Sequence, residues 1–292
     1  MSTLIVGCGY LGLRVARLLV GRGDVVFGTT RSQGRFAELR AAGIEPVLCD
    51  VARPPLRLPA ADRVLHCVGN DRSAGVPMRM VYVNGLLNVI KSLTSHPIRF
   101  VYASTTGVYA QSDGSWVDED SVTAPTSESG RVCLDAEELL RAESARRGLS
   151  TVILRFSGLY GPGRIVRREA LARGEPILGE PSRWLNLVQI DDAASAVLAA
   201  LDATGPGPLY TVSDDRPVAR AEYYRLVAEL TGAPPPAFRP PAPSETTRRE
   251  DSDKRVSNRR IKAETGWIPS HPDIRSGVPA SLAAEVSGPP IA

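Results

Sequence analysis

Short apolar runs rich in β-branched residues alternate with longer stretches of helical periodicity through the first half of the chain. Such runs predict strands, and the stretches between them predict helices. The runs are apolar almost throughout, as in a sheet covered by helices on both faces, so we predict an α/β fold with a doubly wound parallel sheet. The predicted strands are Thr3–Gly7, Asp24–Thr29, Glu45–Cys49, Arg63–Val68, Ile98–Ala103 and Ser150–Phe156, and the predicted helices are Leu11–Gly21, Arg35–Ala42, Met80–Thr94 and Val132–Arg147.

Glycine and proline interrupt this alternation beyond residue 157. We therefore predict a core over residues 1–156 and a smaller C-terminal substrate lobe over most of residues 157–292. Within the second part, a helix over 192–201 and a strand over 209–212 are expected to return to the core.

Three further segments of the second part carry local signals. Apolar spacing predicts a helix at Arg220–Leu230. The prolines of Pro234–Pro243 break regular structure. The charged stretch Arg248–Arg260 mixes both signs, which is typical of a solvated surface turn.

Composition places the chain among ordinary globular proteins, since 43% of its 292 residues are hydrophobic and 23% are charged. A formal charge of +3 spread along the chain gives no reason to expect a nucleic-acid partner. No apolar run reaches the roughly 18 residues of a membrane span. The first strand begins without a charged leader, so we expect a cytoplasmic protein with no membrane partner.

Cysteine and histidine are too scattered to suggest metal chemistry. The four cysteines lack C-x-x-C spacing and lie mostly beside apolar runs, so we expect reduced core thiols at Cys8, Cys49, Cys67 and Cys133. The three histidines are far apart in the sequence, and no metal site is predicted.

A glycine motif, Gly7-x-Gly9-x-x-Gly12, directly follows the first predicted strand and opens the first predicted helix. In this context Gly7 permits a tight turn, Gly9 allows the backbone to approach a pyrophosphate, and Gly12 allows the helix to pack closely on the strand. The free N–H groups at the helix start favour bound phosphate. We therefore predict a Rossmann-type dinucleotide site that includes Tyr10 and Leu11.

The end of the second strand predicts which dinucleotide binds. A site selective for NAD needs a carboxylate here for the ribose hydroxyls. The sequence instead has Thr30, Arg31 and Ser32. A guanidinium forms charge-assisted bonds to phosphate, so we predict NADP, with NAD the weaker alternative. A surface arginine without a ligand is the other interpretation of Arg31.

The remaining cofactor contacts are predicted from position, because ligands of parallel sheets lie at the carboxyl ends of strands. Asp50 and Val51 follow the third strand, where they meet the adenine. Val68 and Gly69 end the fourth strand beneath the adenine ribose, and Phe156 ends the sixth.

Six further segments lie at predicted strand ends and helix starts along the chain: 65–69 (LHCVG), 83–88 (VNGLLN), 101–109 (VYASTTGVY), 154–163 (LRFSGLYGPG), 188–192 (VQIDD) and 266–269 (GWIP). In order and spacing they resemble the extended short-chain dehydrogenase/reductases, the family of sugar-nucleotide epimerases and dehydratases. The resemblance covers residues 1 to about 275. It implies a Rossmann core, a C-terminal lobe that closes over a small-molecule substrate, and a catalytic Ser/Thr, Tyr and Lys.

The resemblance puts the catalytic Ser/Thr at Thr105, with Ser104 and Thr106 as close alternatives. The family's Tyr and Lys positions read Ser129 and Cys133, and a shifted register offers Ser127 and Arg131. Serine is a poor acid near neutral pH and a thiol carries no positive charge, so the standard proton transfer is not available. This pattern resembles the atypical, YeeZ-type branch of the family, which lacks the Tyr–Lys pair.

Another group must then handle the proton. Tyr109 and Tyr160 lie in loops after strands and are candidates, although a packed ring with a satisfied hydroxyl is the favoured interpretation of each. Thr106 is a candidate contact to a small polar substrate. Arg183, Trp184 and Asn186 in the lobe loop are candidate contacts to an anionic or carbohydrate-like substrate, and a purely structural role is their favoured alternative.

Two functions follow from these interpretations. The first is an NADP-dependent oxidoreductase or epimerase-like enzyme with a non-standard catalytic set. The alternative is a catalytically inactive NADP-binding regulatory or sensor protein. The resemblance also implies a homodimer through the helices Met80–Thr94 and Val132–Arg147.

Overall fold

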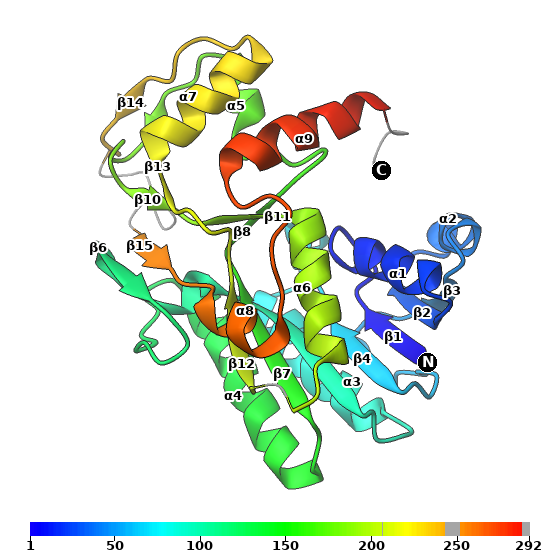
Figure 1. Ribbon diagram of the computed structural model, residues 1–292. Coiled ribbons are helices and arrows are strands. Elements are labelled where there is room, and N and C mark those ends of the chain that lie inside the picture. The colour runs from blue at the N-terminus through cyan, green and yellow to red at the C-terminus, as the bar shows by residue number, and fades with distance from the viewer. Residues whose placement is uncertain (206, 243–251, 288–292) are drawn as a thin grey trace.

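Seven parallel strands form the central sheet of the protein, in the order β12-β7-β5-β4-β1-β2-β3 (Figure 1). The computed structural model describes residues 1–205, 207–242 and 252–287. The prediction of a Rossmann-type doubly wound sheet is confirmed. The strands are β1 (Ser2–Val6), β2 (Val25–Thr30), β3 (Glu45–Leu48), β4 (Arg63–His66), β5 (Arg99–Thr105), β7 (Thr151–Phe156) and β12 (Leu209–Val212).

Helices cover both faces of this sheet because successive strand residues point to opposite sides. Ile5 and Val101 pack in one apolar cluster with α1 (Gly12–Gly21), α2 (Phe36–Ala41) and α6 (Ile190–Asp202). Leu4 and Phe100 pack in a second cluster with α3 (Gly85–Ser92) and α4 (Glu128–Arg147). The apolar strands predicted from the sequence therefore supply two cores, one on each face.

Two helix boundaries differ from the sequence prediction. The helix expected at Val132 begins at Glu128, because Ser127 caps it and accepts a hydrogen bond from the N–H of Gly130 at 3.1 Å. The helix expected over Met80–Thr94 is divided into a π-helical turn, Met80–Asn84, and α3.

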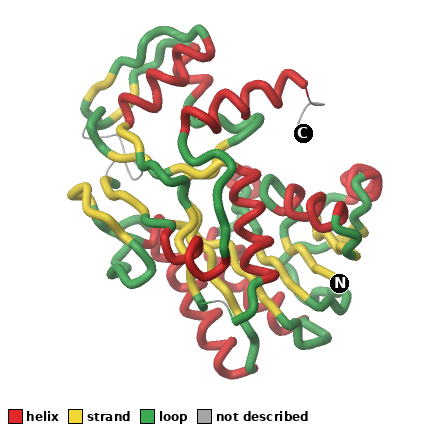
Figure 2. The backbone as a smooth tube through the Cα atoms, viewed as in Figure 1, coloured by secondary structure: helices red, strands yellow, loops and turns green. Residues whose placement is uncertain are grey.

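The C-terminal lobe lies beyond the carboxyl ends of the sheet and contains short strand pairs and three helices within its described residues (Figure 2). Tyr160, Leu171, Tyr223 and Val278 belong to its separate apolar core. Its elements are β8 (Gly158–Tyr160), α5 (Arg168–Ala172), β9 (Ile177–Leu178), β10 (Trp184–Leu185), β11 (Leu187–Gln189), β13 (Val218–Ala219), α7 (Arg220–Thr231), β14 (Phe238–Arg239) and α9 (Ile274–Ser287). Strand β14 corrects the expectation that the proline-rich segment lacks regular structure.

A parallel strand pair joins the core and the lobe. It consists of β6 (Ser112–Val117) and β15 (Asp253–Val256), and α8 (Arg259–Thr265) follows. The surface turn predicted over Arg248–Arg260 is wrong for this part, while residues 248–251 lie outside the described residues. Burial alternates along β15, and the charged residue types concealed that strand periodicity.

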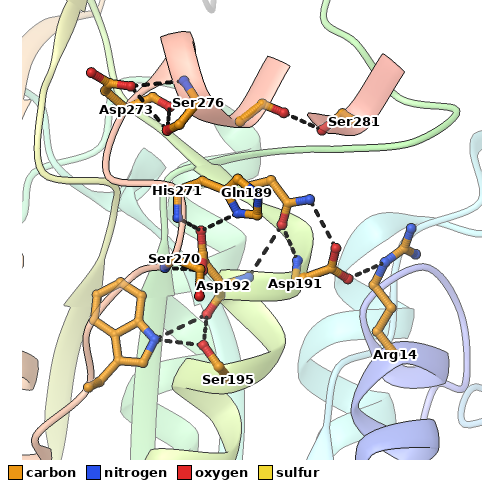
Figure 3. Close-up of polar contacts among 12 residues, drawn as sticks. Arg14, Gln189, Asp191, Asp192, Ser195, Ser270, His271, Asp273, Ser276 and Ser281 are labelled. Atoms are coloured by element: carbon orange, nitrogen blue, oxygen red, sulfur yellow. Dashed lines mark hydrogen bonds and ion pairs between the residues drawn. The ribbon is translucent and has the colours of Figure 1, made fainter. Parts of the chain in front are cut away.

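The start of α6 anchors the last part of the chain (Figure 3). The Asp192 carboxylate accepts hydrogen bonds from the backbone N–H groups of Ser270 at 2.7 Å and His271 at 2.9 Å. The Trp267 Nε1 donates to the Ser195 hydroxyl at 2.9 Å. The side chain that caps α6 is Gln189, whereas Asp191 and Asp192 lie in its first turn.

None of the described helices combines the length and the apolar composition that are needed to cross a lipid bilayer.

Candidate functional site

The turn between β1 and α1 contains three glycines. Two of them leave no room for a side chain, and the third has open space beside it. Gly7 has a φ of +98°, and a Cβ there would lie 2.8 Å from the Val68 backbone. A Cβ on Gly12 would lie 2.3 Å from the Gly7 carbonyl oxygen. A Cβ on Gly9 would meet nothing within 4 Å. The fold therefore requires glycine at 7 and 12, whereas the space beside Gly9 is unused by the protein.

Helix α1 presents its N-terminus to this space without a competing acid. Leu11 makes no side-chain capping bond, and the first turn holds no acidic residue. The unpaired N–H groups and the positive end of the helix dipole thus suit an anion such as phosphate.

A second open backbone position lies beside the glycine turn. The close approach of Gly7 to Val68 brings the ends of β1 and β4 together. A Cβ on Gly69 would also meet nothing within 4 Å. The structure therefore places Gly9 and Gly69 on neighbouring turns at the carboxyl edge of the sheet.

The side chains of several predicted cofactor residues are buried or hydrogen-bonded within the protein. Leu11, Val51 and Phe156 are buried in the apolar clusters, so only their backbones are available to a ligand. The Tyr10 hydroxyl donates to the Pro162 carbonyl at 3.1 Å. The Asp50 carboxylate accepts from the N–H of Ala52 at 3.0 Å.

Arg31 leaves the end of β2 and forms an ion pair with Asp71 at 2.7 Å. Hydrogen bonds from Ser73 and from Arg31 lower the pKa of Asp71 to about 2. Because β2 and β4 flank β1, this pair lies across the carboxyl edge of the sheet, on the side of the glycine turn. Thr30 stabilises the same segment, since its hydroxyl accepts from the N–H of Ser32 at 3.2 Å.

Of the three candidate hydroxyls at the carboxyl end of β5, Thr105 is the best placed for a ligand. Ser104 donates to Glu137 at 2.6 Å and is therefore occupied. Thr106 is buried. Thr105 is partly exposed, and among the described residues its oxygen accepts only a local bond from the Gly107 N–H at 3.1 Å.

Tyr109 does not present a phenol to this edge. Its hydroxyl donates to the Asp118 carbonyl at 2.6 Å and accepts from Arg155 at 2.8 Å. Burial raises its pKa to about 12. The second tyrosine, Tyr160, is fully buried in the lobe. The proton-transfer role expected for Tyr109 therefore has no support in the geometry.

The start of α4 supplies no replacement for the missing phenol and ammonium. Ser129 is exposed, with its oxygen 3.3 Å from that of Ser127. Cys133 lies in an apolar cluster, and burial raises the pKa of its thiol to about 11. In the shifted register, Ser127 is the helix cap and Arg131 donates to the Thr126 carbonyl at 2.7 Å.

The predicted substrate residues of the lobe serve mainly to hold β15. Asn186 donates to the Lys254 carbonyl at 2.8 Å and accepts from the Val256 N–H at 2.7 Å, so both ends of its amide are occupied. Its contact to a substrate stays a prediction. The Trp184 ring lies 5.4 Å from the Arg255 guanidinium, and the Arg183 carbonyl accepts a backbone bond at 2.9 Å.

Sequence reasoning missed two residues that the structure brings to this region, Asp71 and Lys254. A carboxylate soon after the fourth strand was the available signal for Asp71. Lys254 lies in the stretch that was predicted to be a surface turn. Within the described ranges, His, Cys, Asp and Glu form no group suited to a metal ion.

Comparison with known proteins gives consistent matches. The NAD dependent epimerase/dehydratase family matches residues 3–212. Protein YeeZ of Escherichia coli K12 is 30% identical over 278 residues, covering 92% of this chain and 96% of YeeZ. A 3-diazoavenalumate denitrifying reductase of a Streptomyces species is 26% identical over 303 residues, covering 95% of this chain and 99% of that protein.

The fold is also that of a solved sugar-nucleotide epimerase. The structure of UDP-glucose 4-epimerase from Thermotoga maritima with UDP-glucose superimposes with a TM-score of 0.79. The match covers 98% of this chain and 99% of the epimerase at 20% identity, so it shows a common fold.

Proposed function

The chain belongs to the NAD dependent epimerase/dehydratase family, and from this premise we propose that it binds a nicotinamide dinucleotide, NADP in preference to NAD. With it the protein acts as an oxidoreductase or epimerase-like enzyme on a small polar, sugar-derived molecule. The similarity to a Streptomyces reductase favours an enzyme over a sensor.

The main support for dinucleotide binding is the open space beside Gly9. A side chain there is compatible with the protein itself, yet the position lies in a turn that leads to an uncapped helix. A bound pyrophosphate explains both features, because it needs close backbone approach and N–H donors.

Arg31 is the residue that supports binding of NADP in preference to NAD. The end of β2 offers a guanidinium and hydroxyls, and its neighbouring carboxylate, Asp71, is paired with that guanidinium. A 2′-phosphate is a better partner for Arg31 than ribose hydroxyls are, since it permits charge-assisted, bidentate bonding.

When bound, the dinucleotide supplies a nicotinamide ring that accepts or donates hydride. Thr105 then orients a substrate carbonyl or hydroxyl at the end of β5. The buried Arg155–Glu137 pair holds the loop after β5 in place through Ser104 and Tyr109. The alternative, a sensor without turnover, is favoured by one observation: Ser129 and Cys133 provide neither a phenol nor a cation.

A pair of glycine variants tests cofactor binding. Gly9→Ala and Gly21→Ala both place a methyl group where the protein offers no contact within 4 Å. Both variants are expected to keep the parent melting temperature, but only Gly9→Ala should weaken NADPH binding, by more than about 30-fold, because the methyl group occupies the pyrophosphate space. Differential scanning calorimetry measures the melting temperature, and isothermal titration calorimetry measures the NADPH affinity. Equal NADPH affinity in the two variants would contradict the proposal.

Turnover distinguishes the enzyme from the sensor. Loss of the near-ultraviolet absorbance of bound NADPH upon adding small carbonyl compounds supports an enzyme, because the carbonyl accepts the hydride. A gain of that absorbance when UDP-sugars are added to the NADP-loaded protein supports an enzyme as well, because a sugar hydroxyl gives up the hydride. Tight binding of the dinucleotide with neither change supports the sensor. Thr105→Ala should abolish most of any turnover and leave NADPH affinity unchanged.

A further inference from the structure

Lys254 is a buried cation in strand β15. The residue is 4% exposed, and its ammonium donates to the Tyr109 carbonyl at 3.3 Å and the Ser252 hydroxyl at 2.7 Å. Both acceptors are neutral. Across the residues that the structure describes, no carboxylate forms an ion pair with it.

Two of the three arginines that are buried among the described residues have carboxylate partners. Arg155 pairs with Glu137 at 2.7 Å, and Arg63 pairs with Asp24 at 2.6 Å and Asp202 at 2.8 Å. Removing an ion from water costs several kcal/mol unless a counter-charge compensates it. Lys254 has no such partner among the described residues, so its charge is uncompensated there, as is typical of a group that meets a ligand.

The residue type also matters here. Only three of the 35 lysine and arginine residues are lysines, namely Lys91, Lys254 and Lys262. An ammonium is a compact point charge with three donors, and its protonation responds to burial, unlike that of a guanidinium. Burial lowers the pKa of Lys254 to about 8.

The position of Lys254 is on the ligand side of the sheet. Tyr109, its acceptor, follows Thr105 in the loop at the carboxyl end of β5. Strand β15 pairs with β6 and lies beside β10 of the lobe, between the two parts of the molecule (Figure 1). Val256, on the same side of β15, packs in one cluster with Cys133, which occupies the family's lysine position.

We propose that Lys254 binds an oxyanion of the substrate, a carboxylate or a phosphoryl group, where the lobe meets the carboxyl edge of the sheet. Two of its three N–H groups donate to the protein, which leaves one N–H donor and the positive charge without a partner among the described residues. This inference rests on the proposed function, because the oxyanion belongs to the substrate that reacts at that edge.

Lysine-selective isotope labelling tests the proposal on the full chain. With ¹³C,¹⁵N-lysine, NMR shows only three side chains, which substitution with arginine assigns. Titration with inorganic phosphate or acetate should shift the Lys254 resonances saturably, and raise its pKa by at least about one unit, because an adjacent anion favours the ammonium. Lys91 and Lys262 should follow the sodium chloride control.

The two anions identify the group. A response to phosphate alone assigns a phosphoryl ligand, and a response to acetate alone assigns a carboxylate. If neither anion shifts Lys254 beyond the sodium chloride control, the proposal is wrong. NADPH calorimetry on the same sample separates the outcomes. Absence of dinucleotide binding contradicts the proposed function, whereas an unshifted Lys254 in a protein that binds NADPH contradicts the oxyanion site alone.

Lys254→Met distinguishes a ligand site from a structural tether. Removing an uncompensated charge should leave the melting temperature unchanged or raise it, as should the control Lys91→Met. A fall of more than about 5 °C for Lys254→Met alone would show that its two hydrogen bonds hold the fold, and would overturn the proposal.

Discussion

In the proposed complex, two anions compete for the guanidinium group of Arg31. Asp71 holds it now at 2.7 Å, and the 2′-phosphate of NADP requires the same donors. Asp71→Asn should therefore tighten NADPH binding about three- to tenfold and leave NADH binding unchanged. Calorimetry at fixed salt measures this change.

The matched control for this prediction is Glu138→Gln, which changes the net charge equally at an exposed position on α4. Glu138→Gln should leave NADPH affinity as in the parent. A weaker NADPH complex in Asp71→Asn would mean that Asp71 positions Arg31 for the phosphate instead of competing with it.

His66 gives the protein a specific acid sensitivity. Its ring is buried against Phe100 and Tyr102, and burial lowers its pKa from 6.5 to about 4. The unfolded chain takes up a proton near pH 6.5 and the folded chain only near pH 4, so stability is lost as the pH falls through this window. At about 1.4 kcal/mol per pKa unit, the loss is roughly 3 kcal/mol.

His66→Leu should remove this dependence. Urea unfolding at a series of pH values between 7 and 4 measures it, with exposed His96→Gln as the control that keeps the parent slope. An unchanged slope in His66→Leu would show that other groups cause the acid loss.

Residue-level prediction from the sequence succeeded where backbone geometry dictates the residue type. Gly7 and Gly12 are required by close contacts within one turn, which the motif reveals. It failed where the partner is distant in sequence: Asp71 is 40 residues from Arg31, and Lys254 is 145 residues from Tyr109. Tyr109 was assigned to chemistry because its partner Arg155, 46 residues away, is invisible locally.

Helix α4 is fixed to the sheet by a buried charge as well as by apolar packing. Glu137 is fully buried and pairs with Arg155 of β7 at 2.7 Å. Glu137→Gln should destabilise the protein by about 3–5 kcal/mol, because it leaves the guanidinium buried without a counter-charge. Urea unfolding measures this loss.

Glu143→Gln, on the same helix, is the comparison. Glu143 pairs with Arg146 and Arg147 at the more exposed end of α4. Exposed ion pairs contribute at most about 1 kcal/mol, so this variant should lose little. Similar losses in the two variants would argue against a special role for the buried pair.

Elements with strong apolar periodicity were predicted well, and elements with polar residues were not. All seven sheet strands coincide with predicted runs. Strand β15 was missed because Asp253, Lys254 and Arg255 suggest solvent, although alternate residues are buried. The first turn of α4 was missed because it is polar and depends on the Ser127 cap.

At the scale of the whole molecule, Asp192 connects the core to the last described segment. Its carboxylate accepts from Ser270, from His271 and from the His271 ring Nδ1 at 3.1 Å. Asp192→Asn removes one acceptor oxygen and should cost about 1–3 kcal/mol. Hydrogen exchange should accelerate over residues 265–287 while β1 and β4 stay protected.

Asp191→Asn, one residue earlier, is the control. Its side chain is exposed and pairs with Arg14 at 3.2 Å, so exchange should match the parent protein. Unchanged exchange in Asp192→Asn as well would show that packing of Trp267 alone holds the segment.

The path of the chain limits how the specificity of this molecule can change. After β11 the chain returns to the core as α6 and β12 before it re-enters the lobe at β13. After β14 it returns again, since α8 packs on the core, and it re-enters the lobe with α9. The described part of the lobe is therefore assembled from three separate stretches. Transplanting one stretch alone from a relative would place unmatched side chains in a shared apolar interior. New substrates are therefore reached more readily by point substitutions on the lobe surface than by exchange of modules, and a successful graft must carry all three stretches together.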